Sequence, residues 1–250
     1  MMSDLAIRGP HGDLPIYCAV PTGAGRFPGV VVIHDVGGMS HDLRHQADWL
    51  ASEGFLAAAP NLYHWGKTLT CIRQIMREMR ARHGRSFDEI DAVRTWLARE
   101  PTCTGTVGVI GFCMGGGFAL LLAPGHGYAA SSVNYGTASK DVYTEDYLRD
   151  SCPIVASYGA RDWGNRGNAA RLEQVLTAAG VPHDVKEYPD AGHAFMNDHE
   201  GAGDRIPVVF KVLAAVTRSA YHEPSTRDAR RRIVAFFKTH LSNEVAGTIM

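Results

Sequence analysis

One cysteine of this chain has the neighbours of a nucleophile. Cys113 lies in the glycine-rich segment Gly111–Gly117, after the β-branched run Val107–Ile110 and before the apolar run Phe118–Leu122. This order predicts a strand, a sharp turn and a helix, with the thiol at the turn. Glycines let the two backbones pass closely, and amides at the helix start can stabilise a thiolate or an oxyanion. An arbitrary cysteine is more often a small core residue, but the flanking glycines favour the nucleophile.

A thiol nucleophile needs a base, and the base needs an orienting acid. Asp162 ends the segment Tyr158–Asp162, and His193 follows a turn after Tyr188. Each comes after a predicted strand, where open α/β sheets carry their sites. Taken alone, Asp162 could cap a turn and His193 could be a surface histidine. The chain order of cysteine, acid and histidine is that of the α/β-hydrolase triad, in which serine is the usual nucleophile, and it favours a triad. Asp190 is a rival acid, but it shares a turn with His193 and is badly placed to orient it.

A second glycine-containing loop, His34–Gly38, follows the β-branched run Val30–Ile33. In α/β-hydrolases, the loop at this place supplies one oxyanion-binding amide and the residue after the nucleophile supplies the other. The expected donors are the backbone amides of Val36 and Met114. A glycine-rich turn without a ligand is the alternative for this loop.

Strands and helices that could position these residues alternate along the chain. The predicted strands are Val30–Ile33, Phe55–Ala59, Val107–Ile110, Ala130–Tyr135, Ile154–Tyr158 and Asp184–Tyr188, after a hairpin of Ala6–Arg8 and Leu14–Val20. Besides the helix after Cys113, the predicted helices are His41–Ser52, Cys71–Arg82, Phe87–Arg99, Asn168–Ala179, Ile206–Val216 and Arg227–His240, with Ser40 and Thr226 as N-caps of the first and last. We therefore expect one α/β domain over residues 1–250, with a mostly parallel central sheet and helices on both faces.

Composition excludes several classes of protein. The 250 residues carry a net charge of −1, which indicates no nucleic-acid or anionic-membrane partner. No apolar run approaches the roughly 20 residues of a membrane span, and no signal peptide is evident. The five cysteines include no CxxC pair, which favours reduced thiols in a cytoplasmic protein. His41 and His45 are one helical turn apart, but a solvated helix face is favoured over a metal site because no third ligand of the right kind is near.

Five segments resemble the dienelactone hydrolase family. They are Val31–Gly38, Ala59–Tyr63, Gly111–Gly116, Gly159–Asp162 and Gly192–Phe195. The resemblance implies an α/β-hydrolase fold and hydrolysis of an ester or lactone through an acyl-thiol intermediate, without a metal or an organic cofactor. It also implies that Asp35 tunes the Cys113 thiol, because the family usually has a glutamate there that contacts the resting thiol. A further departure is the absence of an arginine soon after His193, a residue that binds the substrate carboxylate in members active on dienelactone.

We therefore expect a monomer or small homo-oligomer that hydrolyses small esters or lactones with Cys113, His193 and Asp162. Aromatic residues on the predicted loops are expected to border the substrate pocket: Tyr63, Trp65, Trp163 and Phe195. Two alternatives stay open. One is a broad carboxylesterase or thioesterase with the same triad, and the other is a non-hydrolytic binding or redox-sensing protein on the same fold.

Overall fold

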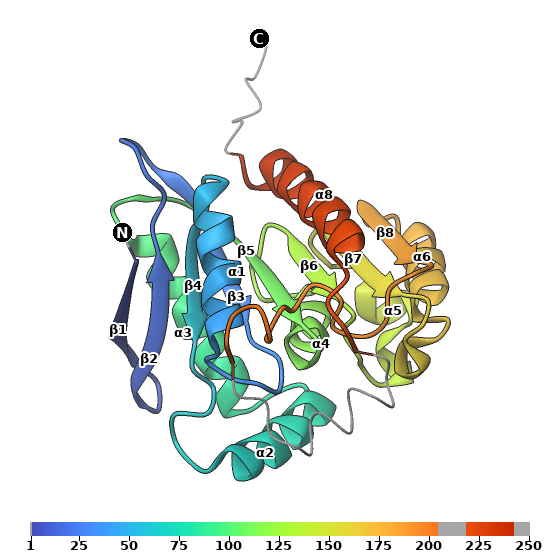
Figure 1. Cartoon of the computed structure of the whole chain (residues 1–250), viewed down its shortest axis with the longest axis horizontal. Coiled ribbons are helices and arrows are strands. Elements are labelled where there is room, and N and C mark those ends of the chain that lie inside the picture. Colours follow the sequence, from blue (N-terminus) through green and yellow to red (C-terminus); the bar gives the residue numbers. More distant parts are fainter. Residues whose placement is uncertain (1, 205–218, 243–250) are drawn as a thin grey trace.

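The computed structural model describes residues 2–204 and 219–242 (Figure 1). An eight-stranded sheet forms its centre, with the strand order β1-β2-β4-β3-β5-β6-β7-β8. The strands are β1 (Met2–Gly9), β2 (Gly12–Ala19), β3 (Phe27–Ile33), β4 (Leu56–Pro60), β5 (Cys103–Phe112), β6 (Ser131–Asn134), β7 (Ile154–Gly159) and β8 (His183–Tyr188). The predicted helix over 206–216 lies outside the described residues.

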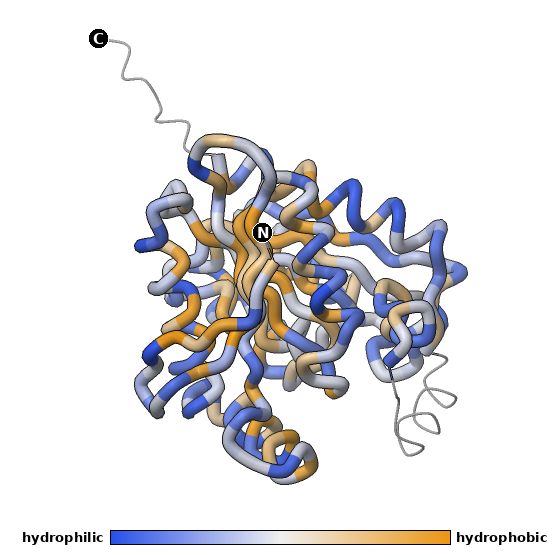
Figure 2. The backbone as a smooth tube through the Cα atoms, turned by 60° about the vertical axis from the view of Figure 1, so that its left-hand side comes forward, coloured by the Kyte–Doolittle hydropathy of each residue, from blue (hydrophilic) through white to orange (hydrophobic). Residues whose placement is uncertain are grey.

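Six of the strands are parallel, and the hairpin β1–β2 is antiparallel and joins the sheet beside β4. The β-branched run of β3 shows why the parallel part is stable. Val30, Val31, Val32 and Ile33 are all completely buried, as expected for a strand covered on both faces. Figure 2 shows the hydrophobic residues concentrated along these central strands. The predicted α/β-hydrolase architecture is therefore confirmed.

Helices cover both faces of the sheet (Figure 1). They are α1 (His41–Ser52), α2 (Thr68–Ala81), α3 (Arg85–Arg99), α4 (Met114–Leu121), α5 (Glu145–Leu148), α6 (Asn168–Ala179) and α8 (Glu223–Leu241), with the 3-10 turns η1 (Lys140–Val142) and η2 (Trp163–Asn165). Apolar residues of α1 and α8 pack with Val30 and Val32 in one core. Those of α2, α3, α4 and α6 pack in a second core, with Val31 and Ile33 on the other face. No helix within the described ranges is long and apolar enough to span a membrane.

The N-termini of α1 and α8 test the two predicted N-caps. Ser40 caps α1 as predicted, because its side chain accepts a hydrogen bond from the Leu43 amide at 3.1 Å. The cap predicted at Thr226 is wrong: α8 begins at Glu223, with His222 as its N-cap. Thr226 lies in the first turn, and its hydroxyl donates to the Phe195 carbonyl at 2.7 Å. It therefore ties the helix start to the segment after His193.

Candidate active site

Cys113 lies between the end of β5 and the start of α4, with φ 54° and ψ −111°. Positive φ is strained for a residue with a side chain and is typical of functional turns. The flanking glycines are needed for space. A Cβ atom on Gly111 would lie 1.9 Å from the Gly115 carbonyl oxygen, and one on Gly115 would lie 2.2 Å from the Ile33 carbonyl oxygen. The close packing of α4 on two strands therefore holds the partly exposed thiol at the edge of the sheet.

Parallel pairing brings the other predicted residues to the same edge. Ile33 lies opposite Gly111 in the β3–β5 pair, so the loop after β3 begins beside the turn that carries Cys113. Gly159 lies opposite Tyr188 in the β7–β8 pair, so Asp162 and His193 follow neighbouring strand ends.

His193 and Asp162 are in direct contact. The Nδ1 atom of His193 lies 2.6 Å from Oδ2 of Asp162, which is 1% exposed. Asp162 also accepts hydrogen bonds from the Gly164 amide at 3.0 Å and the Asn165 side chain at 2.7 Å. Burial raises the pKa of Asp162, but these hydrogen bonds outweigh it and hold the pKa below its usual value. Asp190 instead pairs with Arg161 at the surface, at 2.8 Å.

The imidazole of His193 links this carboxylate to the thiol. Burial lowers the pKa of His193, whereas hydrogen bonds to Asp162 and Cys113 raise it, and the pKa reaches about 10. Because Nδ1 is bound to Asp162, the nitrogen that faces the thiol is Nε2. A histidine with this pKa holds the proton at neutral pH and can give it to a leaving group.

Tyr135, which the sequence did not single out, supports the His193 ring. It follows β6, has φ 40°, and its ring packs edge-on to His193 at 5.3 Å between ring centroids. Its hydroxyl donates to Asn197 Oδ1 at 2.5 Å, and its carbonyl accepts from the Asn165 side chain at 3.0 Å. The sequence signal that could have pointed to Tyr135 is its position at the end of a predicted strand.

Hydrogen bonds of His34 and Tyr63 fix the loop after β3. His34 is completely buried, and burial lowers its pKa, so its imidazole is neutral. Its Nδ1 donates to the Asp35 carbonyl at 2.6 Å, and its Nε2 accepts from the Leu62 amide at 3.3 Å. The Tyr63 hydroxyl donates to the Val36 carbonyl at 3.3 Å.

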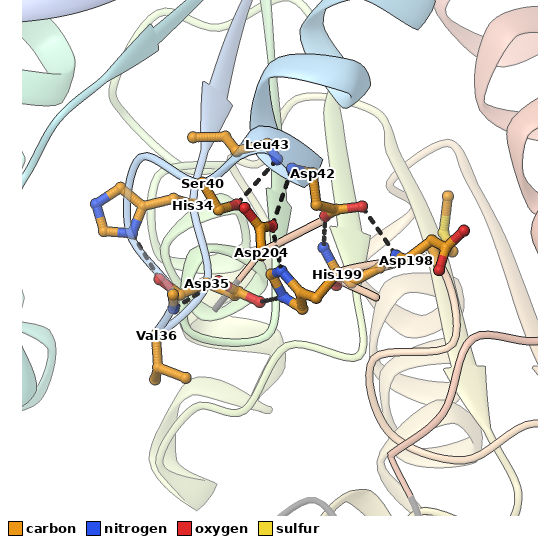
Figure 3. Close-up of polar contacts among 12 residues, drawn as sticks. His34, Asp35, Val36, Ser40, Asp42, Leu43, Asp198, His199 and Asp204 are labelled. Carbon is orange, nitrogen blue, oxygen red and sulfur yellow. Dashed lines mark hydrogen bonds and ion pairs between the residues drawn. The ribbon is translucent and has the colours of Figure 1, made fainter. Parts of the chain in front are cut away.

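Both oxygens of the Asp35 carboxylate are bound. Oδ1 accepts from the Gly37 amide at 2.7 Å, and Oδ2 lies 2.8 Å from Nε2 of His199 (Figure 3). The other ring nitrogen of His199 lies 3.0 Å from Asp204. Sequence reasoning missed His199 and Asp204 because neither lies in a recognisable motif, and Asp35 and His199 are 164 residues apart.

The four aromatic residues expected at the pocket differ in their placement. Tyr63 lies against the loop after β3, and Trp163, next to Asp162, is 70% exposed. Trp65 is partly buried, with the Arg85 guanidinium 5.2 Å from its ring centroid.

Phe195 corrects the expectation that all four border the pocket. Its side chain is completely buried and packs against Tyr135 and Tyr188, with ring centroids 5.4 and 5.1 Å apart. The chain turns inward directly after His193, where Ala194 has φ 54°, so Phe195 belongs to the core.

His41 and His45 lie on an exposed part of α1, and His41 contacts Asp204 at 3.0 Å. Among the described residues, no group of three His, Cys, Asp or Glu side chains is arranged to hold a metal ion.

A mostly parallel eight-stranded sheet with a strained cysteine at a strand–helix turn defines the class of this protein as an α/β-hydrolase. The model of the dienelactone hydrolase family matches residues 14–241, and the chain belongs to that family. It is therefore a hydrolase of carboxylic esters or lactones.

Individual relatives agree with this assignment. The carboxymethylenebutenolidase of Rhodococcus opacus is 26% identical over 249 residues, which cover 94% of this chain and 90% of the relative. A crystal structure assigned to a dienelactone hydrolase of Klebsiella pneumoniae has a TM-score of 0.74 and 26% identity, and the match covers 95% of this chain and 98% of that one. A dienelactone hydrolase-like phosphotriesterase from metagenomic libraries shares the fold, with a TM-score of 0.75, 20% identity, and coverage of 96% of this chain and 99% of that one.

Proposed function

We propose that this protein hydrolyses small esters or lactones through a Cys113–His193–Asp162 triad and an acyl-thiol intermediate. The observation that carries the proposal is the 2.6 Å contact of the buried Asp162 carboxylate with His193, whose pKa is raised by both Asp162 and Cys113. Such an arrangement would combine a nucleophile, a base and an orienting acid.

In the first half of the reaction, His193 Nε2 already holds the proton, because its pKa of about 10 keeps the imidazole protonated, and the Cys113 thiolate attacks the substrate carbonyl carbon. The carbonyl π electrons move to oxygen, giving a tetrahedral oxyanion. When the oxyanion collapses, the carbon–oxygen ester bond breaks, and His193 gives the proton to the departing alkoxide. An alcohol is released from an ester, whereas the hydroxyl of an opened lactone stays attached to the acyl group. The acyl group is left as a thioester on Cys113.

Hydrolysis of the thioester completes the cycle. His193 takes a proton from water, whose oxygen attacks the thioester carbonyl carbon. The carbon–sulfur bond then breaks, and the Cys113 thiolate is regenerated beside the protonated His193. Asp162 stays ionised throughout and keeps Nδ1 protonated, because its hydrogen bonds lower its pKa.

The backbone amides of Val36 and Met114 are the proposed oxyanion donors. Met114 is the first residue of α4, and first-turn amides of a helix have no acceptor within the helix. Two such donors, fixed before the reaction, would each lower the barrier by about 3 kcal/mol. Asp35, from the same loop, is proposed to tune the Cys113 thiol.

Aromatic surfaces near the site favour an apolar or aromatic substrate. Tyr63 touches the proposed oxyanion loop, and Trp163 exposes most of its indole beside Asp162. The four residues after His193 are Ala, Phe, Met and Asn, so no arginine there binds a substrate carboxylate. We therefore propose an uncharged ester or lactone as substrate.

The test is a panel of p-nitrophenyl esters, thioesters and lactones, with mass spectrometry of the protein quenched during turnover. We expect an acyl adduct on Cys113, and we expect Cys113→Ala to lower kcat by at least about 10³-fold. Cys152→Ala is the matched control, because Cys152 is also partly exposed but burial raises its pKa to about 12. Esterase activity retained by Cys113→Ala would overturn the mechanism, and labelling of Cys113 without turnover of any substrate would favour a binding or redox-sensing role.

A further inference from the structure

His199 lies between two carboxylates and contacts both. Its Nε2 is 2.8 Å from Asp35 Oδ2, and its Nδ1 is 3.0 Å from Asp204 Oδ2 (Figure 3). A neutral imidazole has one N–H and one lone pair, so it would direct a lone pair at one of these carboxylates. Only the imidazolium donates to both, and the geometry therefore requires a positive charge on His199.

The carboxylates around His199 stabilise this charge. Burial lowers the pKa of His199, but Asp35 and Asp204, together with the more distant Asp42 of α1, raise it to about 10. The His199 side chain is 18% exposed, and those of Asp35 and Asp204 are 8% and 11% exposed. Solvent screening of these interactions is therefore incomplete.

Asp204 is itself fixed by the start of α1. Its carboxylate accepts hydrogen bonds from the backbone amides of His41 at 2.8 Å and Asp42 at 3.1 Å. A carboxylate at a helix N-terminus satisfies amides that have no partner within the helix, and it is favoured by the helix dipole. The start of α1 therefore holds Asp204, and Asp204 in turn holds His199.

The opposite side of His199 faces the loop that carries Val36. Asp35 accepts from the Gly37 amide, so its side chain closes a turn around Val36. A Cβ atom on Gly37 would lie 3.3 Å from Cε1 of His199, so the ring packs directly on this turn. A shift of His199 would therefore be transmitted to the backbone of Val36.

We infer that His199, held by Asp204, is a positioning residue that fixes the Asp35 turn and neutralises the Asp35 charge on the loop that begins beside the Cys113 turn. The inference rests on the proposed function of Cys113 and Val36. His199 has two separate effects. It orients the Val36 amide for the oxyanion, and it prevents the Asp35 carboxylate from disfavouring the thiolate, since an unneutralised negative charge raises a thiol pKa.

The test compares His199→Gln with the wild type. Glutamine can keep a hydrogen bond to Asp35 but carries no charge and cannot also reach Asp204 from the other side. We expect kcat to fall by about 10- to 100-fold, with KM changed by less than about threefold, because oxyanion binding acts on the transition state. We also expect iodoacetamide to alkylate Cys113 more slowly at neutral pH, since an Asp35 carboxylate without its cationic partner disfavours a second negative charge on the thiolate.

His41→Gln is the matched control. His41 also contacts Asp204 through its ring, at 3.0 Å, but it is exposed and does not contact Asp35. We expect this variant to keep the kcat, the KM and the alkylation profile of the wild type. Asp204→Asn is the second test variant if His199→Gln fails to fold, and its expected effects have the same direction.

Folded His199→Gln with the wild-type kcat and alkylation profile would overturn the inference, as would a change in KM alone. Failure of the proposed function has a different signature: no ester turnover by the wild type, or turnover by Cys113→Ala. In that case, the alkylation profiles still decide whether His199 acts on the thiol.

Discussion

At the scale of single residues, the site depends on how each side chain binds its neighbours. Three non-glycine residues with positive φ, Cys113, Tyr135 and Ala194, lie at or next to the proposed triad. Strained backbone persists only where the surrounding contacts enforce it. Here the contacts are the α4 packing, the Tyr135 hydrogen bonds and the burial of Phe195.

The contact between Asp162 and His193 gives a prediction at this scale. In Asp162→Asn, the amide can donate to Nδ1, which then stays unprotonated and leaves the proton on Nε2, facing the thiol. We expect kcat/KM to fall by at least about 10³-fold and the pKa of His193 to fall, as measured by steady-state kinetics and NMR titration. Asp190→Asn is the matched control, because this carboxylate pairs with Arg161 at the surface. Near-wild-type activity in Asp162→Asn would exclude the triad.

At the scale of elements, the strand–turn–helix of β5 and α4 decides where the thiol lies. A helix of eight residues with three consecutive glycines is intrinsically weak. Its glycines are nevertheless required, because backbone atoms of β3, of β6 and of the loop after β6 occupy the space of their side chains. The three glycines therefore lower the intrinsic stability of α4 but allow it to pack closely at the site.

Gly115→Ala tests this conclusion. On helix preference alone, alanine would stabilise α4 by about 1 kcal/mol. Because its Cβ would lie 2.2 Å from the Ile33 carbonyl oxygen, we expect instead a loss of about 3 kcal/mol in the free energy of unfolding, measured by urea denaturation. Gly66→Ala is the control, since the nearest atom to its Cβ would be 3.4 Å away. A more stable Gly115→Ala would contradict the packing argument.

At the scale of the whole molecule, two segments far apart in sequence carry the site and are tied together by charge. Asp42 of α1 accepts from the Asn197 side chain at 2.6 Å and from the Asp198 amide at 2.8 Å. With the ion pair of Asp35 and His199, these contacts join the first half of the sheet to the segment after β8. Stability should therefore depend on the charge of partly buried histidines in this region.

The pH dependence of stability follows from two raised pKa values. The pKa values of His193 and His199 are about 10 in the folded protein and about 6.5 in the unfolded chain. Above pH 6.5, the folded state therefore binds more protons, and stability falls as pH rises. Their contribution is full below about pH 6.5 and lost as pH rises through about 10.

We expect Tm to fall steadily between about pH 6.5 and 8, below the pH at which thiols of the unfolded chain titrate. His199→Gln should show a shallower decline, and His41→Gln should follow the wild type, as measured by differential scanning calorimetry. A wild-type slope in His199→Gln would contradict the assignment of this charge.

Much of the fold could be predicted because local pattern fixes it. The β-branched run of β3, the period of α1 and the glycine after α6 each specify an element within a few residues. The start of α8 was misplaced because Pro224, in its first turn, permits an earlier beginning than the Thr226 cap suggested.

The sequence by itself determined the order of Cys113, Asp162 and His193 and the strand ends that carry them, because local preferences and burial periodicity set the elements. Only the tertiary structure decided that Asp35 binds His199 and that Phe195 turns into the core. The first outcome depends on a contact between loops more than 100 residues apart, and the second depends on a single backbone turn. No local sequence pattern encodes either of them.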